Sequence, residues 1–208
     1  MIAIAARSPT LHVIALGANS GLNREANTRV IGRAAVELSR LLKGLRGSSV
    51  WRSPAWPPGS GPDFVNAVVA GWSPMTPARL LSRLHAIEAR FGRVRHLRWG
   101  PRILDLDLVA SGGLVRPDAA TLRAWMALPA AEQPRRTPES LLLPHPRMED
   151  RAFVLLPMAE IWPGWRHPLS GRSVADAAAS LPSGARDGMR RLGRRPLAGP
   201  PRKGRRRK

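Results

Sequence analysis

The segment RWGPRILDLDL, residues 98–108, combines two arginines, a Trp-Gly-Pro bend and two aspartates. On a strand, Asp105 and Asp107 lie two positions apart and point to the same face, while the leucines beside them point to the other. Adjacent carboxylates repel each other, and a divalent cation reverses that balance. Mg²⁺ suits such a pair because it prefers hard oxygen ligands and completes its shell with water and phosphate. The alternative is a solvated strand face with two surface charges.

Four arginines stand on the Gly- and Pro-punctuated segment around this bend: Arg93, Arg95, Arg98 and Arg102. Guanidinium groups bind phosphate oxygens in a bidentate manner, so the segment can hold a polyphosphate from one side while a metal binds it from the other. A basic loop that only rests on nucleic acid would not need the aspartates. The Walker pattern GxxxxGK[ST] is absent from the sequence, which excludes a P-loop enzyme. The combination predicts a nucleoside triphosphate as ligand.

The elements that must position these residues follow from hydrophobic periodicity. The pattern predicts strands over 11–17, 47–53, 63–72 and 103–110 and helices over 22–42 and 77–91. Thr76 is expected to cap the second helix, with Pro77 at its first position and Gly92 closing it. The order β-α-β-β-α-β is the ferredoxin-like arrangement. We therefore predict an α+β fold, a sandwich with an antiparallel sheet and packed helices.

Beyond the fourth strand, the sequence predicts one domain over 11–183 with an excursion at about 117–138 and a basic tail over 184–208. Within the excursion, TLRAWMALPAAEQ is expected to form a helix that packs Leu122, Trp125 and Met126 on the body. SVADAAASL resembles a short capped helix. The net charge is +20, and residues 186–208 hold eleven Lys or Arg and one Asp, so the tail carries half of it.

The tail is rich in Pro, Gly and Arg and offers little to bury, so we expect it to be disordered. It is interpreted as a solubilising extension or, alternatively, as a tether for polyanions whose binding would weaken with salt. Removing the residues after about Ala185 is expected to leave the activity intact.

The composition of the 208 residues narrows the class of protein further. Hydrophobic residues make up 43% of the chain, enough for a packed core, and the absence of cysteine excludes disulfides and thiolate metal sites. No secretory signal or membrane span is recognisable. We predict a soluble, cytoplasmic monomer.

Six motifs occur in an order that resembles a known family. They are LGAN, WRSP, PDFVNAV, IEARFGRVR, RWGPRILDLD and LPHPRMEDRAFVL. Together they are similar to the 6-hydroxymethyl-7,8-dihydropterin pyrophosphokinases of folate synthesis, over about residues 13–168 except the excursion. The resemblance implies transfer of the β,γ-pyrophosphoryl group of ATP to the hydroxymethyl group of the pterin, with release of AMP.

The resemblance also implies roles for single residues. Asp105 and Asp107 would hold two Mg²⁺ ions, and Arg93 and Arg102 would contact the phosphates and support transfer. The remaining members of the implied ATP site are Glu88, Arg95, Arg98, Trp99, His145 and Arg151. The implied pterin site comprises Ser53, Pro54, Trp56, Phe64, Asn66, Trp99 and Phe153. Arg95, Arg98 and Trp99 would belong to a loop that closes over the site.

Several of these residues have simpler interpretations, and some depart from the family. Phe64 and Phe153 would on their own be core residues, and Glu88 could instead pair with a nearby arginine. Many relatives have threonine at Ser53 and smaller apolar residues at Trp56, and the loop between Arg95 and Arg98 is one residue shorter than in some relatives. The other histidines are interpreted as surface or packing residues: His12, His85, His96 and His167.

Two further hypotheses compete with the enzyme. One is a nucleic-acid-binding ferredoxin-like module with a relic active site, but the K/R-G-F/Y-G/A-F-V-x-F/Y run of RNA-recognition modules is absent and the chain has no tyrosine. The other is a catalytically dead pterin-binding scaffold, which the intact aspartate pair and arginines disfavour. The expected partners are therefore ATP and the pterin, without a membrane, and with nucleic acid only through the tail.

Overall fold

A computed structural model of the chain describes residues 8–21, 23–55, 61–92, 103–129, 132, 135–193 and 197. Its centre is an antiparallel sheet with the strand order β5-β1-β4-β3-β6, and β2 pairs with the other end of β4. The strands are β1 (Thr10–Ala18), β2 (Lys43–Gly47), β3 (Trp51–Ser53), β4 (Phe64–Ser73), β5 (Asp105–Ser111) and β6 (Arg190–Arg191). The predicted ferredoxin-like α+β fold is confirmed.

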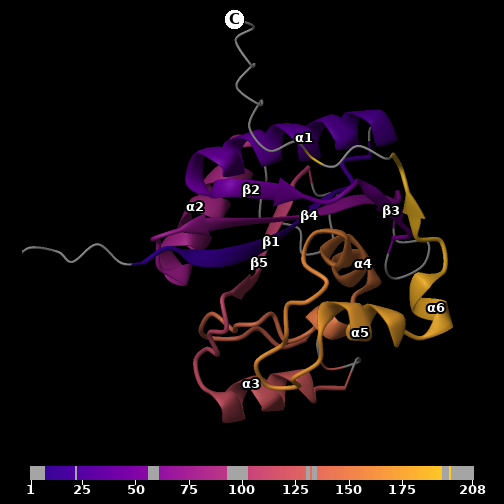
Figure 1. Cartoon of the computed structure of the whole chain (residues 1–208). Helices are drawn as coiled ribbons and strands as arrows, with labels where there is room; N and C mark the ends of the chain where they lie inside the picture. The colour runs from indigo at the N-terminus through magenta and orange to yellow at the C-terminus, as the bar shows by residue number, and fades with distance from the viewer. Residues whose placement is uncertain are drawn as a thin grey trace, which may run out of the picture.

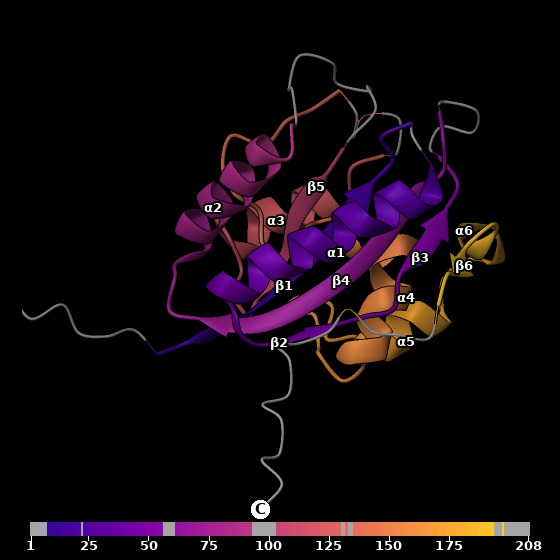
Figure 2. The same cartoon turned by 90° about the horizontal axis from the view of Figure 1, so that it is seen from above.

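Helices cover both faces of this sheet (Figures 1 and 2). One face is covered by α1 (Arg24–Leu41) and α2 (Pro77–Arg90), and the other by α4 (Ala152–Ile161) and α5 (Val174–Ala179). Each face has its own apolar core, because side chains of a strand alternate between the two sides. On β1, for example, Ile14 and Leu16 face α1 and α2, whereas Val13 and Ala15 face α4 and α5.

Local signals fix the helix ends. Asn23 caps α1 by accepting a hydrogen bond from Ala26 N–H at 2.7 Å, and Thr76 caps α2 by accepting one from Arg79 N–H at 3.3 Å. Gly92 adopts a φ of 85° just after α2, a conformation that favours glycine. α5 begins after Ser173, as its sequence predicts.

The strand predicted over 47–53 is wrong, because two strands occupy this stretch of the sheet edge. β2 ends at Gly47 and β3 begins at Trp51. Between them the Ser48 hydroxyl accepts a hydrogen bond from Val68 N–H at 3.0 Å. A side chain thus takes a position that a backbone carbonyl would hold in a continuous ladder.

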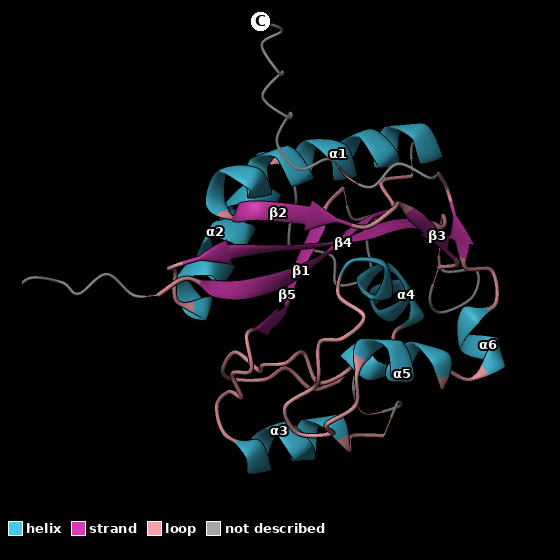
Figure 3. Cartoon of the chain, in the orientation of Figure 1, coloured by secondary structure: helices cyan, strands magenta, loops and turns pink. Residues whose placement is uncertain are grey.

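The excursion leaves the sheet after β5 and forms α3 (Ala119–Met126), which lies apart from the strands (Figure 3). Backbone hydrogen bonds between Arg116 and Leu143 join its two ends, at 2.8 and 3.2 Å. Leu122 is fully buried and Trp125 and Met126 are half-buried. The helix predicted for TLRAWMALPAAEQ is thus confirmed in its first half, and it ends at Met126. The remaining short helices are η1 (Met148–Asp150) and α6 (Ser183–Arg186). Among the helices described, none has the length and apolar character needed to cross a bilayer.

The chain after residue 183 differs from the expected disordered tail at its beginning. Residues 183–186 form α6, and Arg190 and Arg191 form β6, which pairs with β3. The boundary predicted at residue 184 therefore falls too early. Residues 198–208 lie outside the described residues.

We expect the free energy of unfolding to decrease as the pH falls below about 6.5, the ordinary value for histidine. Burial lowers the pKa of His12 and of His167, so the folded chain keeps both neutral while the unfolded chain takes up protons. Each such group steepens the pH dependence by up to about 1.4 kcal/mol per pH unit.

Urea unfolding between pH 8 and pH 5 measures this dependence. His12→Gln and His167→Gln are each expected to flatten it. Equal slopes in the parent and both variants would contradict the prediction.

Candidate active site

The site is built on the face of the sheet that α4 covers, where one row of residues crosses three strands. Asp105 on β5 lies opposite Gly17 on β1, and Gly17 lies opposite Asn66 on β4. Opposed residues of an antiparallel pair share a face. The row therefore joins one of the two carboxylates to a buried amide, with a glycine between them.

Gly17 has no side chain, so space remains at the centre of this row. A Cβ atom at Gly17 would lie 3.6 Å from Asn66 Oδ1, 3.9 Å from Asp105 Cβ and 4.0 Å from Phe64 Cδ1. These are ordinary van der Waals distances, so the neighbours of Gly17 converge on the space where a side chain would stand. No signal in the sequence marks Gly17 as a site residue, although it ends the apolar run LHVIALG.

The amide end of the row is preorganised by a hydrogen bond. Asn66 Nδ2 donates to Ser53 Oγ at 2.9 Å, and both side chains are buried. This bond fixes the orientation of the amide and leaves Asn66 Oδ1 facing the space above Gly17. Phe64 begins β4 two residues before Asn66 and shares its face. The structure thus brings Ser53, Phe64 and Asn66 together.

At the carboxylate end, four predicted residues form a connected cluster around Arg151. Arg151 Nη1 lies 3.5 Å from Asp107 Oδ2 and 3.4 Å from His145 Nε2. The Arg151 guanidinium also lies over the Phe153 ring, 5.5 Å from its centroid. Arg151 directly precedes α4, so the start of this helix aims the guanidinium at β5. The side chain of Asp107 remains 43% exposed, which leaves oxygen available to a ligand.

His145 is held neutral in this cluster. Burial, reinforced by the positive charges of Arg151 and Arg147, lowers its pKa to about 3. Its Nδ1 accepts a hydrogen bond from Arg147 N–H at 3.1 Å, and the Arg151 guanidinium, which can only donate, lies 3.4 Å from its Nε2. The neutral ring thus adds no positive charge of its own, and the guanidinium beside it is a donor that suits an anion.

Glu88 has a structural contact in addition to any role in ligand binding. It is 2% exposed, and its Oε1 accepts a hydrogen bond from Leu106 N–H at 2.8 Å. Leu106 lies between the two aspartates on β5, a strand at the edge of the sheet. The carboxylate of Glu88 therefore satisfies an edge N–H group and fixes the strand that carries the acidic pair.

Of the other predicted residues, one is exposed beside the site and six lie outside the described residues. Pro54 follows β3 and is exposed. Six predicted residues fall outside the described part of the chain: Trp56, Arg93, Arg95, Arg98, Trp99 and Arg102. Within the described part, no cluster of three or more His, Asp or Glu could hold a metal ion. A cation at Asp105 and Asp107 would therefore draw further ligands from a substrate, from water or from undescribed residues.

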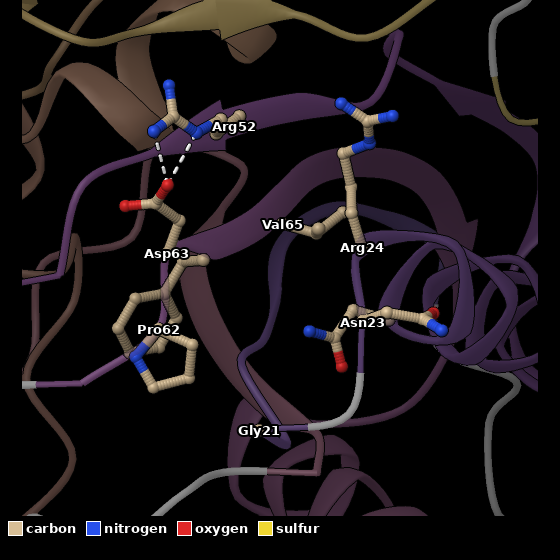
Figure 4. Close-up of a pocket in the computed structure, with 9 residues that line it drawn as sticks. Gly21, Asn23, Arg24, Arg52, Pro62, Asp63 and Val65 are labelled. Carbon is tan, nitrogen blue, oxygen red and sulfur yellow. Dashed lines mark hydrogen bonds and ion pairs between the residues drawn. The ribbon is translucent and has the colours of Figure 1, made fainter.

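A separate pocket of about 300 Å³ opens beside the site, where α1 begins. Its lining residues are Gly21, Asn23, Arg24, Asn27, Arg52, Pro62, Asp63, Phe64 and Val65. An ion pair between Arg52 and Asp63 forms one side of it (Figure 4). Arg52 and Val65 oppose each other and alternate with Ser53 and Asn66, so the pocket opens mainly on the α1 side of the sheet.

The ferredoxin-like sheet and the carboxylate, arginine and amide groups along one face define an α+β ligand-binding domain. The chain belongs to the 7,8-dihydro-6-hydroxymethylpterin-pyrophosphokinase (HPPK) family, whose family model matches residues 13–163.

Several relatives support this membership. The chain is 41% identical to a 2-amino-4-hydroxy-6-hydroxymethyldihydropteridine pyrophosphokinase of Synechocystis over 129 residues, which cover 62% of this chain and 55% of the relative. It is 38% identical to the protein of the same name from Methylorubrum extorquens over 138 residues, covering 66% of this chain and 73% of the relative. The chain thus spans little more than half of the Synechocystis relative.

Solved structures show the same fold. The wild-type HPPK-DHPS of Plasmodium falciparum matches with a TM-score of 0.56 and 12% identity, over 82% of this chain and 44% of that chain. A structure of HPPK-DHPS in complex with substrates matches with a TM-score of 0.61 and 10% identity, over 83% and 43% of the two chains.

Proposed function

We propose that the chain transfers the β,γ-pyrophosphoryl group of ATP to the hydroxymethyl oxygen of 6-hydroxymethyl-7,8-dihydropterin. The oxygen attacks the β-phosphorus and loses its proton, the bond from that phosphorus to the AMP oxygen breaks, and AMP leaves. The observation that carries the proposal is the row Asp105, Gly17 and Asn66, which sets a carboxylate for metal-bound phosphate beside an amide for a flat heterocycle.

The pterin would lie across Gly17 between the two ends of this row. The amide of Asn66 offers both a donor and an acceptor, which complements the amide-like edge of a pterin. Its orientation is already fixed by Ser53, so little ordering is needed on binding. Phe64 at one side, and Phe153 from the start of α4, are aromatic rings that suit stacking on a heterocycle.

The triphosphate would lie over the carboxylates and the donors of α4. Asp105 and Asp107 share one face of a rigid strand and offer the oxygen ligands that Mg²⁺ prefers, so they fit the two ions that the family implies. Bound Mg²⁺ would neutralise charge on the phosphates. Arg151 and the neutral His145 would bind phosphate oxygens, and Arg93 and Arg102 are proposed to support transfer from outside the described residues.

The test is an AMP-forming assay with ATP and Mg²⁺, with and without the pterin. We expect AMP and the pterin diphosphate in equal amounts, and little AMP without the pterin. ATP consumption independent of the pterin, or formation of ADP, would contradict the proposal.

The alternative of a nucleic-acid-binding module with a relic site is not favoured by the family membership. The cytoplasmic location, the monomeric state and nucleic-acid binding through the tail stay predictions.

A further inference from the structure

The chain beyond the family match forms an added strand next to the strand that ends in the pterin site. β6 continues the sheet beyond β3, and backbone hydrogen bonds extend the contact toward β2. The partners are Arg190 opposite Arg52, Arg191 opposite Trp51, Leu192 N–H to Val50 O at 2.8 Å, and Leu197 N–H to Ser48 O at 2.9 Å. The segment therefore supports β3 at Trp51 and Arg52 and the chain that leads into it, up to the residue before Ser53.

The turn before β6 rests directly on the residue that follows β3. A Cβ atom at Gly188 would lie 2.5 Å from Pro54 Cγ, closer than real atoms approach, and at a tight 3.1 Å from Pro54 Cδ. Gly188 also has a φ of 72°, in the region that favours glycine. Glycine thus permits the turn to press against Pro54, and a larger residue would displace one or the other.

Glu160 of α4 joins the added strand to β3. Its carboxylate accepts hydrogen bonds from Ser49 N–H at 2.7 Å and from Trp51 Nε1–H at 2.9 Å. Arg191 Nε lies 3.2 Å from Glu160 Oε1. One carboxylate therefore connects helix α4, strand β3 and strand β6. Within the part of the chain that the structure describes, the side chain of Arg190 forms no such hydrogen bond or ion pair.

Apolar side chains anchor the segment to both faces of the sheet. Ala185 and Met189 pack against the core under α4 and α5, whereas Leu192 and Leu197 pack against the core under α1 and α2. A segment held on both sides acts as a fixed support, so the position of Pro54 depends on it.

We infer that residues 188–192 position the pterin-binding end of β3, and so set the affinity for the pterin without contacting it. The inference rests on the proposed function. The link is short: the segment holds Pro54 and β3, β3 ends at Ser53, and the Ser53 hydroxyl orients the Asn66 amide. Asp105 and Asp107 lie on β5, at the opposite edge of the sheet, so ATP binding should not depend on this segment.

The experiment compares pairs of matched variants in the AMP-forming assay, with KM measured separately for the pterin and for ATP. Gly188→Val presses on Pro54, and Gly171→Val is its control because Gly171 has nearly the same φ, 71°, and nothing lies within 4 Å of a Cβ there. Arg191→Ala removes the contact with Glu160, and Arg190→Ala removes the same charge from the neighbouring position. A chain ending at Asp187 lacks β6, and one ending at Leu197 lacks only the charged end.

We expect Gly188→Val to raise KM for the pterin about tenfold and to change KM for ATP less than about twofold, since small displacements of positioning groups have effects of this order. Arg191→Ala should raise KM for the pterin in the same direction, and its control Arg190→Ala should not. The chain ending at Leu197 should have the same KM for the pterin as the full chain. The chain ending at Asp187 should have a raised KM for the pterin, so the residues after about Ala185 would not be dispensable for activity.

These measurements distinguish a role of residues 188–192 in positioning the pterin site from a role in stabilising the fold alone. A loss of thermal stability with both KM values unchanged below the unfolding temperature would overturn the inference, as would equal increases in both KM values. If Gly188→Val does not fold, the pair Arg191→Ala and Arg190→Ala still decides. A full chain that forms no AMP with the pterin would overturn the proposed function, and this inference with it.

Discussion

Asp107→Ala is expected to abolish pyrophosphoryl transfer and to leave the fold intact. Asp107 lies on the ligand face of β5, and its side chain is 43% exposed. The strand is held by Leu106 and Leu108, which are buried on its other face. Loss of a metal-binding carboxylate removes several kcal/mol of charge stabilisation, so the rate should fall by about 10³-fold or more. The rate of AMP formation and the thermal unfolding temperature are the two measurements.

Asp107 also pairs with Arg151, so the experiment must separate this contact from metal binding. If the aspartate serves only to hold Arg151, the double variant Asp107→Ala/Arg151→Ala should be no slower than Arg151→Ala alone. We expect the double variant to be slower still. Glu139→Ala, which removes a charge from an exposed position, is the control for net charge. A rate within a few-fold of the parent for Asp107→Ala would refute the metal assignment.

Gly17→Val is expected to remove pterin binding, with a loss of affinity of about 100-fold, because the added carbons would occupy the space between Asn66 and Phe64. The fold should tolerate the change. A Cβ at this position makes only ordinary contacts, and valine is favoured in strands. Gly17→Ala should have an intermediate effect. Affinities for the pterin and for an ATP analogue, measured by calorimetry, test the prediction.

The control for this change is Gly164→Val, because a side chain at Gly164 meets open space. Unaltered pterin affinity in Gly17→Val would show that the heterocycle does not lie across β1. A protein that unfolds would instead be recognised from its circular dichroism, and Gly17→Ala would then decide.

The site residues on β4 and β5 could be predicted because their signals are local. Asp105 and Asp107 share a face through the period of a strand, and Phe64 and Asn66 do so for the same reason. Thr76, Pro77 and Gly92 mark the ends of α2 by their own backbone chemistry. The use of these residues for a pterin and for ATP could not be deduced from spacing, and came from resemblance.

Other parts of the fold depend on contacts between distant segments. α4 is apolar on nearly all sides and contains Pro157, so its sequence lacks the amphipathic stripe that predicts a surface helix. β6 comprises only two arginines, whose strand conformation depends on pairing with β3. The break between β2 and β3 depends on a hydrogen bond from Val68 to the Ser48 hydroxyl. None of these has a local signal in the sequence.

The pairing of β6 with β3 has a consequence for the behaviour of the protein in concentrated solution. Without it, β3 would present unpaired backbone groups, which invite strand addition by another molecule and lead to aggregation. The strand that covers this edge is itself very short and carries two adjacent positive charges, which discourage further pairing by mutual repulsion between copies. Two arginines at this edge are therefore expected to disfavour the joining of separate molecules edge to edge.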